Sequence, residues 1–161
     1  MNVIFSISSA IIEDIQNKQK TRSAWIAYYY FDYKDSSKHD VRGILAFHVS
    51  QLGGDSVRCW GVLYHECRNG SSPPSNAALA NCLEDMLKLP GRLPIFIILD
   101  ALDESPNTVE TPSAREKVLD FMDDLLGSEH PNLFICITSR PEQDIQSVLT
   151  PDIAVAQGLS S

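Results

Sequence analysis

The sequence has little positive charge and no long apolar run. Its 13 lysine and arginine residues are outnumbered by 21 aspartate and glutamate residues, so the 161-residue chain has a formal net charge of −8. Binding to a phosphate backbone or to an anionic membrane surface requires a basic surface. No apolar run approaches the roughly 20 residues that span a bilayer. We therefore expect neither nucleic acid nor a membrane as a partner.

Cysteine is scarce, and no cluster of metal ligands is apparent. The four cysteines lie scattered in apolar stretches and are predicted to be buried free thiols, as in a reducing compartment: Cys59, Cys67, Cys82 and Cys136. His65 with Cys59 and Cys67 does not match the ligand spacing of structural zinc sites, so no zinc is expected. The apolar start at residues 1–5 follows no positive residue and makes a poor signal peptide. These features predict a cytoplasmic protein.

The sequence does contain an alternation of strand and helix patterns suited to one α/β domain over residues 1–161. Two continuous apolar runs predict strands covered on both faces, as in a parallel sheet, and an aromatic-rich segment predicts a third. The strands are expected at 25–31, 95–99 and 133–138, and the helices at about 6–20, 40–52, 55–68, 76–89 and 115–126, with a short one from Pro141. Together they predict a parallel three-layer (αβα) sheet with helices on both faces.

An acidic segment, Asp100-Ala101-Leu102-Asp103-Glu104, follows the apolar run at 95–99. Ligands of open parallel sheets bind at the carboxyl ends of the strands. A divalent ion such as Mg²⁺ would relieve the repulsion among three carboxylates. In a nucleotide hydrolase the first carboxylate lies near the metal and a later one orients the attacking water. From the residues alone, an equally good interpretation is that Asp103 or Glu104 caps the next helix.

The second polar segment, Thr138-Ser139-Arg140-Pro141, follows the apolar run that ends at Ile137. An arginine offers a planar fork of donors that suits a phosphate oxygen. Alternatively, Arg140 neutralises the nearby acidic segment. Neither segment decides the function alone, but a buried strand ending in DALDE and a second ending in TSRP together favour a nucleotide site.

At this point the sequence resembles a known family. IFIILDALDE resembles the extended Walker B motif of NACHT and related STAND-class P-loop NTPases, and ITSRP resembles their sensor motif. YFDYKDSSKHDVRGILAFHVSQL and LYHECRNGSSPPSNAALANCLEDML resemble segments of fungal NACHT proteins with nephrocystin-like N-terminal modules. The resemblance covers about residues 8–149 and leaves 150–161 as a diverged or flexible tail. It implies that strand 95–99 lies in the middle of the sheet, beside strand 133–138.

The resemblance implies a role for each polar residue at the strand ends. Asp100 would support Mg²⁺, and Asp103 and Glu104 would act in hydrolysis or in positioning water. Arg140, with Thr138 and Ser139, would contact the γ-phosphate of ATP or GTP. Members of the family are nucleotide-dependent signalling switches, so protein partners or self-association are expected.

The sequence departs from the family where the phosphate-binding loop should be. Family members carry a strand and G-x-x-x-x-G-K-[ST] directly before the first helix, whereas residues 1–7 hold that place here and no Gly-Lys-Ser or Gly-Lys-Thr occurs. We therefore predict a sheet that is incomplete because its first strand and phosphate loop are missing. Residues 133–138 would then be an exposed edge through which copies of the chain associate.

Two functions remain open at this stage. The chain is predicted to be a partial NACHT/STAND NTPase module with Walker B and sensor motifs and no Walker A motif, inactive as an enzyme on its own. The alternative is a non-hydrolysing, NACHT-like interaction scaffold or decoy.

Overall fold

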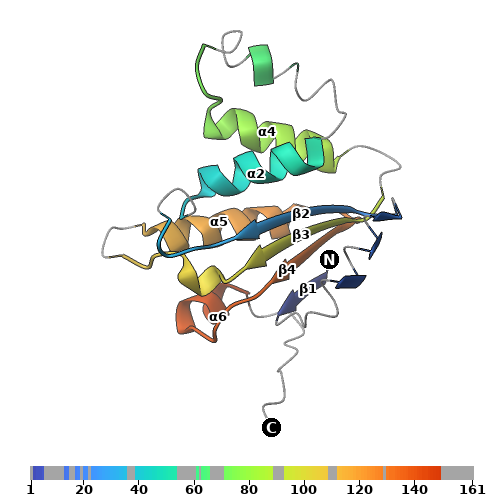
Figure 1. The fold of residues 1–161 in the computed structure, drawn as a ribbon. Helices are drawn as coiled ribbons and strands as arrows, with labels where there is room; N and C mark the ends of the chain where they lie inside the picture. Colours follow the sequence, from blue (N-terminus) through green and yellow to red (C-terminus); the bar gives the residue numbers. More distant parts are fainter. Residues whose placement is uncertain are drawn as a thin grey trace.

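The computed structural model describes residues 2–5, 13–14, 17–18, 20–21, 23–35, 39–53, 61, 63–65, 71–88, 93–108, 112–128 and 130–149. A four-stranded parallel sheet forms its centre, in the order β1-β4-β3-β2 (Figure 1). The strands are β1 (Asn2–Phe5), β2 (Trp25–Tyr30), β3 (Ile95–Asp100) and β4 (Leu133–Ile137). The helices are α2 (Val41–Gly53), α4 (Asn76–Leu87), α5 (Ala114–Gly127) and α6 (Gln143–Leu149), and a 3-10 turn, η2, covers Leu102–Glu104.

The α/β class and the central position of β3 are confirmed. β3 pairs in parallel with β2 on one side and with β4 on the other. The register places Tyr30 of β2 opposite Asp100 of β3, and Leu99 of β3 opposite Ile137 of β4. The three strands therefore end at nearly the same level, which gathers the polar residues that follow them at one edge of the sheet.

The prediction that the first strand is missing is wrong. Residues Asn2–Phe5 form β1, which pairs in parallel with β4 from Asn2 opposite Phe134 to Phe5 opposite Ile137 (Figure 1). Four residues are enough, because each pairing satisfies main-chain groups of β4 that would otherwise lack partners. β4 is therefore not an edge strand, and the predicted association through residues 133–138 loses its basis.

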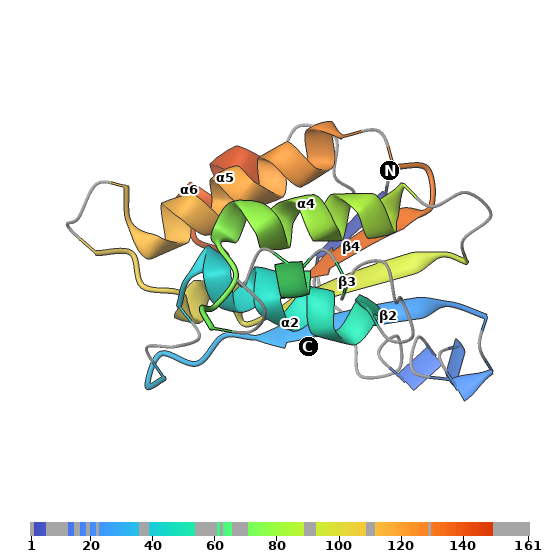
Figure 2. The ribbon, with the colours of Figure 1, turned by 90° about the horizontal axis from the view of Figure 1, so that it is seen from above.

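One face of the sheet carries the main hydrophobic core. Alternate residues of β2, β3 and β4 point to this face and are almost completely buried, among them Ala27, Ile97 and Ile135. Helices α2, α4 and α5 cover this face (Figures 1 and 2). Their buried residues recur at helical spacing, as in α4, where Leu79, Leu83 and Met86 face inward. This layer supports the strands whose ends carry the polar segments.

The opposite face has a smaller described core. Ile26, Ile98 and Cys136 are buried there. The rings of Phe96 and Phe134 stack at a centroid distance of 5.0 Å, and the Lys18 ammonium lies 6.0 Å from the Phe96 ring. Lys18 belongs to the helix predicted at 6–20, most of which lies outside the described residues. The structure therefore describes two of the three predicted layers.

Short polar side chains fix the starts of the helices. Asp40 accepts a hydrogen bond from the N–H of Gly43 at 2.9 Å, and Ser75 accepts one from Ala78 at 3.1 Å. Ser113 and Glu116 form a reciprocal capping box at the start of α5. These caps hold α2, α4 and α5 in place over the core.

Other predictions meet the structure only in part. Most of the helix expected at 55–68, and the whole tail at 150–161, lie outside the described residues. Cys136 is a buried free thiol, whereas Cys82 is disulfide-bonded, so the prediction of four free thiols is wrong at Cys82. Across the described helices, none combines the length and the apolarity that a membrane crossing requires.

Candidate functional site at the strand ends

The acidic segment and the segment Thr138-Ser139-Arg140-Pro141 lie side by side beyond the ends of β3 and β4. Main-chain hydrogen bonds continue the pairing past the last strand residues, from Thr138 N–H to Leu99 C=O at 2.9 Å and from Leu102 N–H to Thr138 C=O at 3.0 Å. The parallel arrangement thus delivers both segments to the same place, as the sequence predicts.

Asp100 is held by hydroxyl groups from the strands on either side. The Thr138 hydroxyl donates to Oδ1 of Asp100, and the Tyr28 hydroxyl donates to Oδ2 at 2.6 Å. Burial, together with the hydrogen bond to Asp100, raises the pKa of Tyr28 above its ordinary value, so this phenol remains a donor. Thr138 also accepts a hydrogen bond from the N–H of Ala101 at 2.8 Å. The carboxylate of Asp100 therefore has a fixed orientation.

Ala101 makes the sharp turn that places the remaining acidic residues. Its φ of 60° and ψ of 47° lie in the left-handed region. Ala101 is the only described residue other than glycine whose φ is positive. This conformation costs about 1–2 kcal/mol for a residue with a Cβ atom. The cost is offset by the hydrogen bond from Ala101 N–H to Thr138 and by the turn η2 that follows. A small residue at this position is thus part of the site's geometry.

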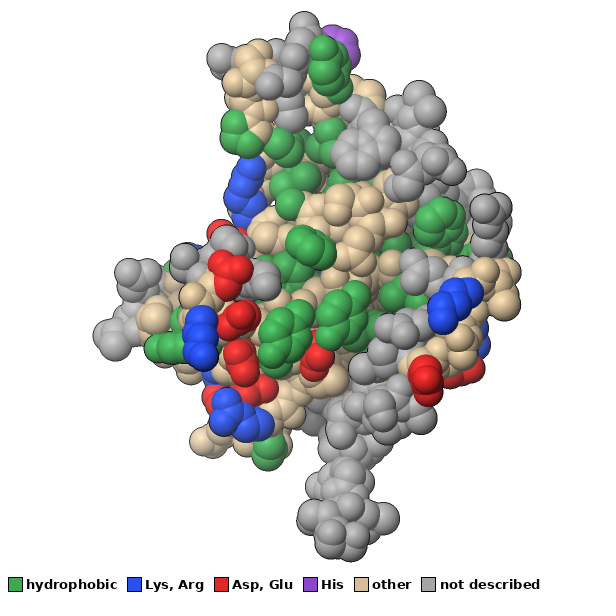
Figure 3. Space-filling model, in the orientation of Figure 1, with side chains coloured by type: hydrophobic (Ala, Val, Ile, Leu, Met, Phe, Trp, Pro, Cys, Tyr) green, Lys and Arg blue, Asp and Glu red, His purple; other side chains and the backbone are tan. Residues whose placement is uncertain are grey.

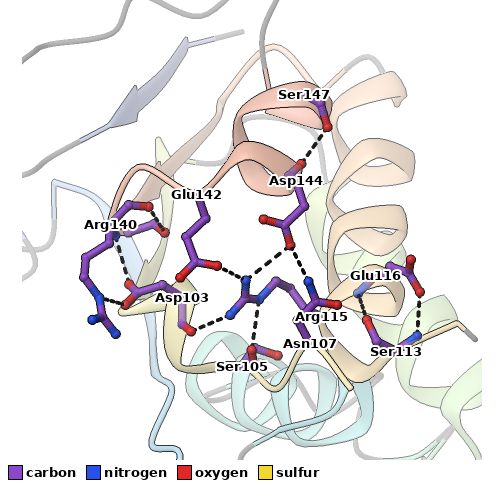
Figure 4. Close-up of polar contacts among 11 residues, drawn as sticks. Asp103, Ser105, Asn107, Ser113, Arg115, Glu116, Arg140, Glu142, Asp144 and Ser147 are labelled. Atoms are coloured by element: carbon purple, nitrogen blue, oxygen red, sulfur yellow. Dashed lines mark hydrogen bonds and ion pairs between the residues drawn. The ribbon is translucent and has the colours of Figure 1, made fainter. Parts of the chain in front are cut away.

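Asp103 and Arg140 form a two-point pair across the strand ends (Figure 4). The main-chain N–H of Arg140 donates to Oδ1 of Asp103 at 3.0 Å, and its Nε donates to Oδ2. Burial would raise the pKa of Asp103, but the hydrogen bonds from Arg140 outweigh it and hold that pKa below its usual value. The Arg140 side chain is 75% exposed, whereas that of Asp103 is 7% exposed. The interpretation that Arg140 neutralises the acidic segment therefore describes this structure.

The remaining predicted site residues make contacts elsewhere. Glu104 accepts a hydrogen bond from the N–H of Tyr33 at 3.2 Å, which ties η2 to the loop after β2. The Ser139 hydroxyl donates to the carbonyl of its neighbour Arg140 at 2.8 Å. The structure thus joins Asp100 to Thr138 and Asp103 to Arg140, and it connects Glu104 and Ser139 to neither pair through their side chains.

A buried arginine that was not predicted from the sequence holds the main chain of the site in place. Arg115, at the start of α5, has a side chain only 6% exposed. Its Nη2 donates to the carbonyl of Asp103 at 2.6 Å, and its Nε donates to that of Ser105 at 2.9 Å (Figure 4). Its Nη1 forms ion pairs with Glu142 and, at 3.2 Å, with Asp144. One guanidinium thus connects η2, α5 and the segment that follows the sensor.

A weak sequence signal points to Arg115. A cation in the first turn of a helix opposes the helix dipole, so Arg115 is out of place there unless it has acidic partners. Two candidates, Glu142 and Asp144, stand directly after Pro141. Their pairing is visible only once the fold brings α5 beside α6. The role of Tyr28 has no comparable signal, because its contact with Asp100 depends on strand order.

Asp100 and Thr138 supply oxygen donors, which are the ligand type that Mg²⁺ takes. Within the described residues, no three acidic, histidine or cysteine side chains come together as a metal cage. Mg²⁺ in nucleotide sites takes only one or two carboxylates and keeps several waters, a limited role that Asp100 with Thr138 fits. The phosphate half is not matched, because Phe5 at the end of β1 is followed by Ser6-Ile7-Ser8-Ser9, which has neither glycine nor lysine.

Comparison with known proteins identifies one family. Residues 6–140 match the family model described as nephrocystin 3, N-terminal. The matched region contains β2, β3 and β4 and both polar segments, from Asp100 to Arg140, and it begins directly after β1. The comparison with curated proteins found no match.

Proposed function

The chain belongs to the nephrocystin 3 N-terminal family, and on this premise we propose that it is a NACHT-like module of the P-loop NTPase class. In this proposal it carries the Mg²⁺-binding and γ-phosphate-sensing half of a nucleotide-dependent signalling switch. IFIILDALDE is its Walker B segment, and ITSRP is its sensor segment.

The observation that carries the proposal is the double link between two parallel strand ends. Asp100 at the end of β3 is bonded to Thr138 after β4, and Asp103 of η2 is bonded to Arg140. A metal-binding carboxylate and an arginine that reads a phosphate must lie next to each other, because the metal and the terminal phosphate are in contact in such sites. The linked strand ends meet this requirement.

In this proposal each residue at the strand ends has a separate role. Asp100, oriented by the hydroxyls of Tyr28 and Thr138, would hold the metal, whose chemistry is to neutralise charge on the phosphates. The terminal guanidinium nitrogens of Arg140 are on an exposed side chain and would meet the γ-phosphate. Glu104, with Asp103, would position water. Arg115 holds the main chain of Asp103 in place for these contacts.

The lack of a glycine-lysine loop limits what the chain does alone. The lysine and the amide cradle bind the β- and γ-phosphates of P-loop enzymes, so we propose that this chain by itself does not hydrolyse ATP or GTP. The second candidate is a non-hydrolysing interaction scaffold, and it is supported by the Asp103 carboxylate, which has its hydrogen-bond partners in Arg140 without a ligand. Either role suits a cytoplasmic protein with protein partners.

Titration with Mn²⁺ followed by electron paramagnetic resonance tests the metal role directly. We expect Asp100→Asn to weaken Mn²⁺ binding at least tenfold, because the metal loses its charged ligand. Asp120→Asn is the matched control, since Asp120 is an exposed carboxylate on α5, away from the strand ends. Equal Mn²⁺ affinity in the parent chain and in Asp100→Asn would rule out Asp100 as the metal ligand.

A further inference from the structure

Among the described strands, β2 lies at one margin of the sheet (Figure 2). At its two ends, Trp25 donates its N–H to Pro94 at 2.8 Å and Phe31 donates to Asp100 at 3.0 Å, both toward β3. Main-chain groups alternate sides along a strand, so Ile26, Tyr28 and Tyr30 present their N–H and C=O groups to the open side.

The middle of this edge is closed by a side chain. Tyr28 donates its N–H to Oε1 of Gln51 at 2.8 Å and accepts from Nε2 of Gln51 at 2.8 Å. The amide of Gln51 thus pairs with Tyr28 as the main chain of a neighbouring strand would. Gln51 is held there because Val49 and Leu52, its neighbours on α2, are buried in the core.

The rest of the edge has the composition of a strand that pairs readily. The segment WIAYYY contains aromatic and β-branched residues and neither a charge nor a proline. Tyr30 at its end is 45% exposed. Figure 3 shows hydrophobic side chains gathered over the middle of this side of the molecule. Exposed edges usually carry a charge or a proline that blocks pairing, and β2 relies on Gln51 instead.

We propose that the β2 edge is a pairing surface for β2 of a second copy of this chain, and that Gln51 keeps it closed. Antiparallel pairing about a two-fold axis at Tyr28 would place Tyr28 opposite its counterpart and Ile26 opposite Tyr30. Two such central residues exchange both of their hydrogen bonds, with the same two groups that Gln51 now occupies. A second copy suits this edge because WIAYYY has no charge that would attract a partner of opposite charge. In addition, two identical edges related by a two-fold axis form a closed dimer.

Light scattering coupled to size-exclusion chromatography tests this proposal. The parent chain should be monomeric, and Gln51→Ala should shift it to a dimer at the same concentration. Ser50→Ala is the matched control, because the Ser50 hydroxyl bonds only to Phe47 of its own helix, and it should stay monomeric. Adding Tyr30→Lys to Gln51→Ala should restore the monomer, because a lysine blocks edge pairing.

Two results would overturn the proposal. One is a folded Gln51→Ala variant that remains a monomer, which would show that the edge does not pair when opened. The other is a dimer that Tyr30→Lys does not dissociate, which would place the contact elsewhere. Gln51→Leu fills the same volume without the amide, so it replaces Gln51→Ala if circular dichroism shows that the alanine variant is unfolded.

Discussion

The guanidinium of Arg115 donates to the main-chain carbonyl of Asp103 at 2.6 Å, while Arg140 binds the carboxylate of the same residue. Asp103 is therefore held by two arginines that differ in exposure. The buried Arg115 fixes the main chain of η2, whereas the exposed Arg140 can exchange its carboxylate partner for another anion. In the proposed function, this division would let Arg140 respond to a ligand while Arg115 keeps the main chain of η2 in place.

Removal of the buried arginine should destabilise the fold strongly. Arg115→Met leaves the carbonyls of Asp103 and Ser105 without their donor, in a site where Ser105 is completely buried. We expect the free energy of unfolding to fall by about 3 kcal/mol in urea denaturation. Lys117→Met, an exposed change on the same helix, should cost less than about 0.5 kcal/mol. Similar losses in both variants would contradict the role of Arg115.

Loss of the Thr138 hydroxyl should lower the free energy of unfolding, because the hydroxyl makes two hydrogen bonds. Thr138→Val keeps the shape of the side chain but removes the donor to Asp100 and the acceptor for Ala101 N–H. A loss of about 1–3 kcal/mol is expected from thermal or urea unfolding, and Thr138→Ser should recover most of it. Ser139→Ala serves as the control, because its hydroxyl bonds only to the adjacent carbonyl. A serine variant no better than valine would show that the hydroxyl is unimportant.

Relief of the left-handed turn should stabilise the protein. Ala101→Gly removes the Cβ atom at a φ of 60°, and the gain exceeds the added flexibility of glycine in the unfolded chain. We expect a gain of about 0.5–1 kcal/mol in the free energy of unfolding. Ala101→Val should lower the free energy of unfolding by roughly 1 kcal/mol or more, because a β-branched side chain clashes with the main chain in the left-handed conformation. A glycine variant less stable than the parent would show that the turn is not strained.

Acid should weaken the fold through His48. Burial without a described hydrogen-bond partner lowers the pKa of His48 to about 3. In the unfolded state His48 takes up a proton below about pH 6.5, whereas in the folded state it stays neutral down to about pH 3. The contribution of His48 to the free energy of unfolding is therefore complete above about pH 6.5 and is lost as the pH falls toward 3. Between pH 7 and pH 5 this amounts to about 2 kcal/mol.

The comparison of variants isolates the effect of His48 from that of the carboxylates. Urea denaturation of His48→Leu at both pH values should show a drop in stability about 2 kcal/mol smaller than that of the parent chain. His65→Leu is the control, because His65 is exposed in the folded state and should leave the drop unchanged. If His48→Leu shows the parent's full drop, His48 is not the group responsible.

The sequence predicted those parts of the fold that local patterns determine. The apolar runs at 95–99 and 133–137 identified β3 and β4, and apolar residues at helical spacing identified α2, α4 and α5. The order of the strands followed from the family resemblance. The short β1 was missed because its formation depends on the open side of β4, and a local pattern does not contain that information.

The sequence predicted which segments form the site, but it did not predict which side chains contact one another there. Asp100, Thr138, Asp103 and Arg140 were identified because they follow buried strands, and parallel pairing gathers such residues. The partners of Asp100 and Asp103 could not be predicted. Tyr28 reaches Asp100 across 72 residues of sequence, and Arg115 reaches Asp103 from the next helix. These contacts depend on strand order and on the packing of α5.

Release of labelled phosphate from ATP and from GTP, in the presence of Mg²⁺, tests the central claim most directly. We propose that this chain has the metal and sensor residues of a nucleotide site without the glycine-lysine loop. The parent chain should therefore release phosphate no faster than Asp100→Ala. A Mg²⁺-dependent excess over that variant would contradict the account, and loss of the excess in Glu104→Gln would then assign the water-positioning role to Glu104.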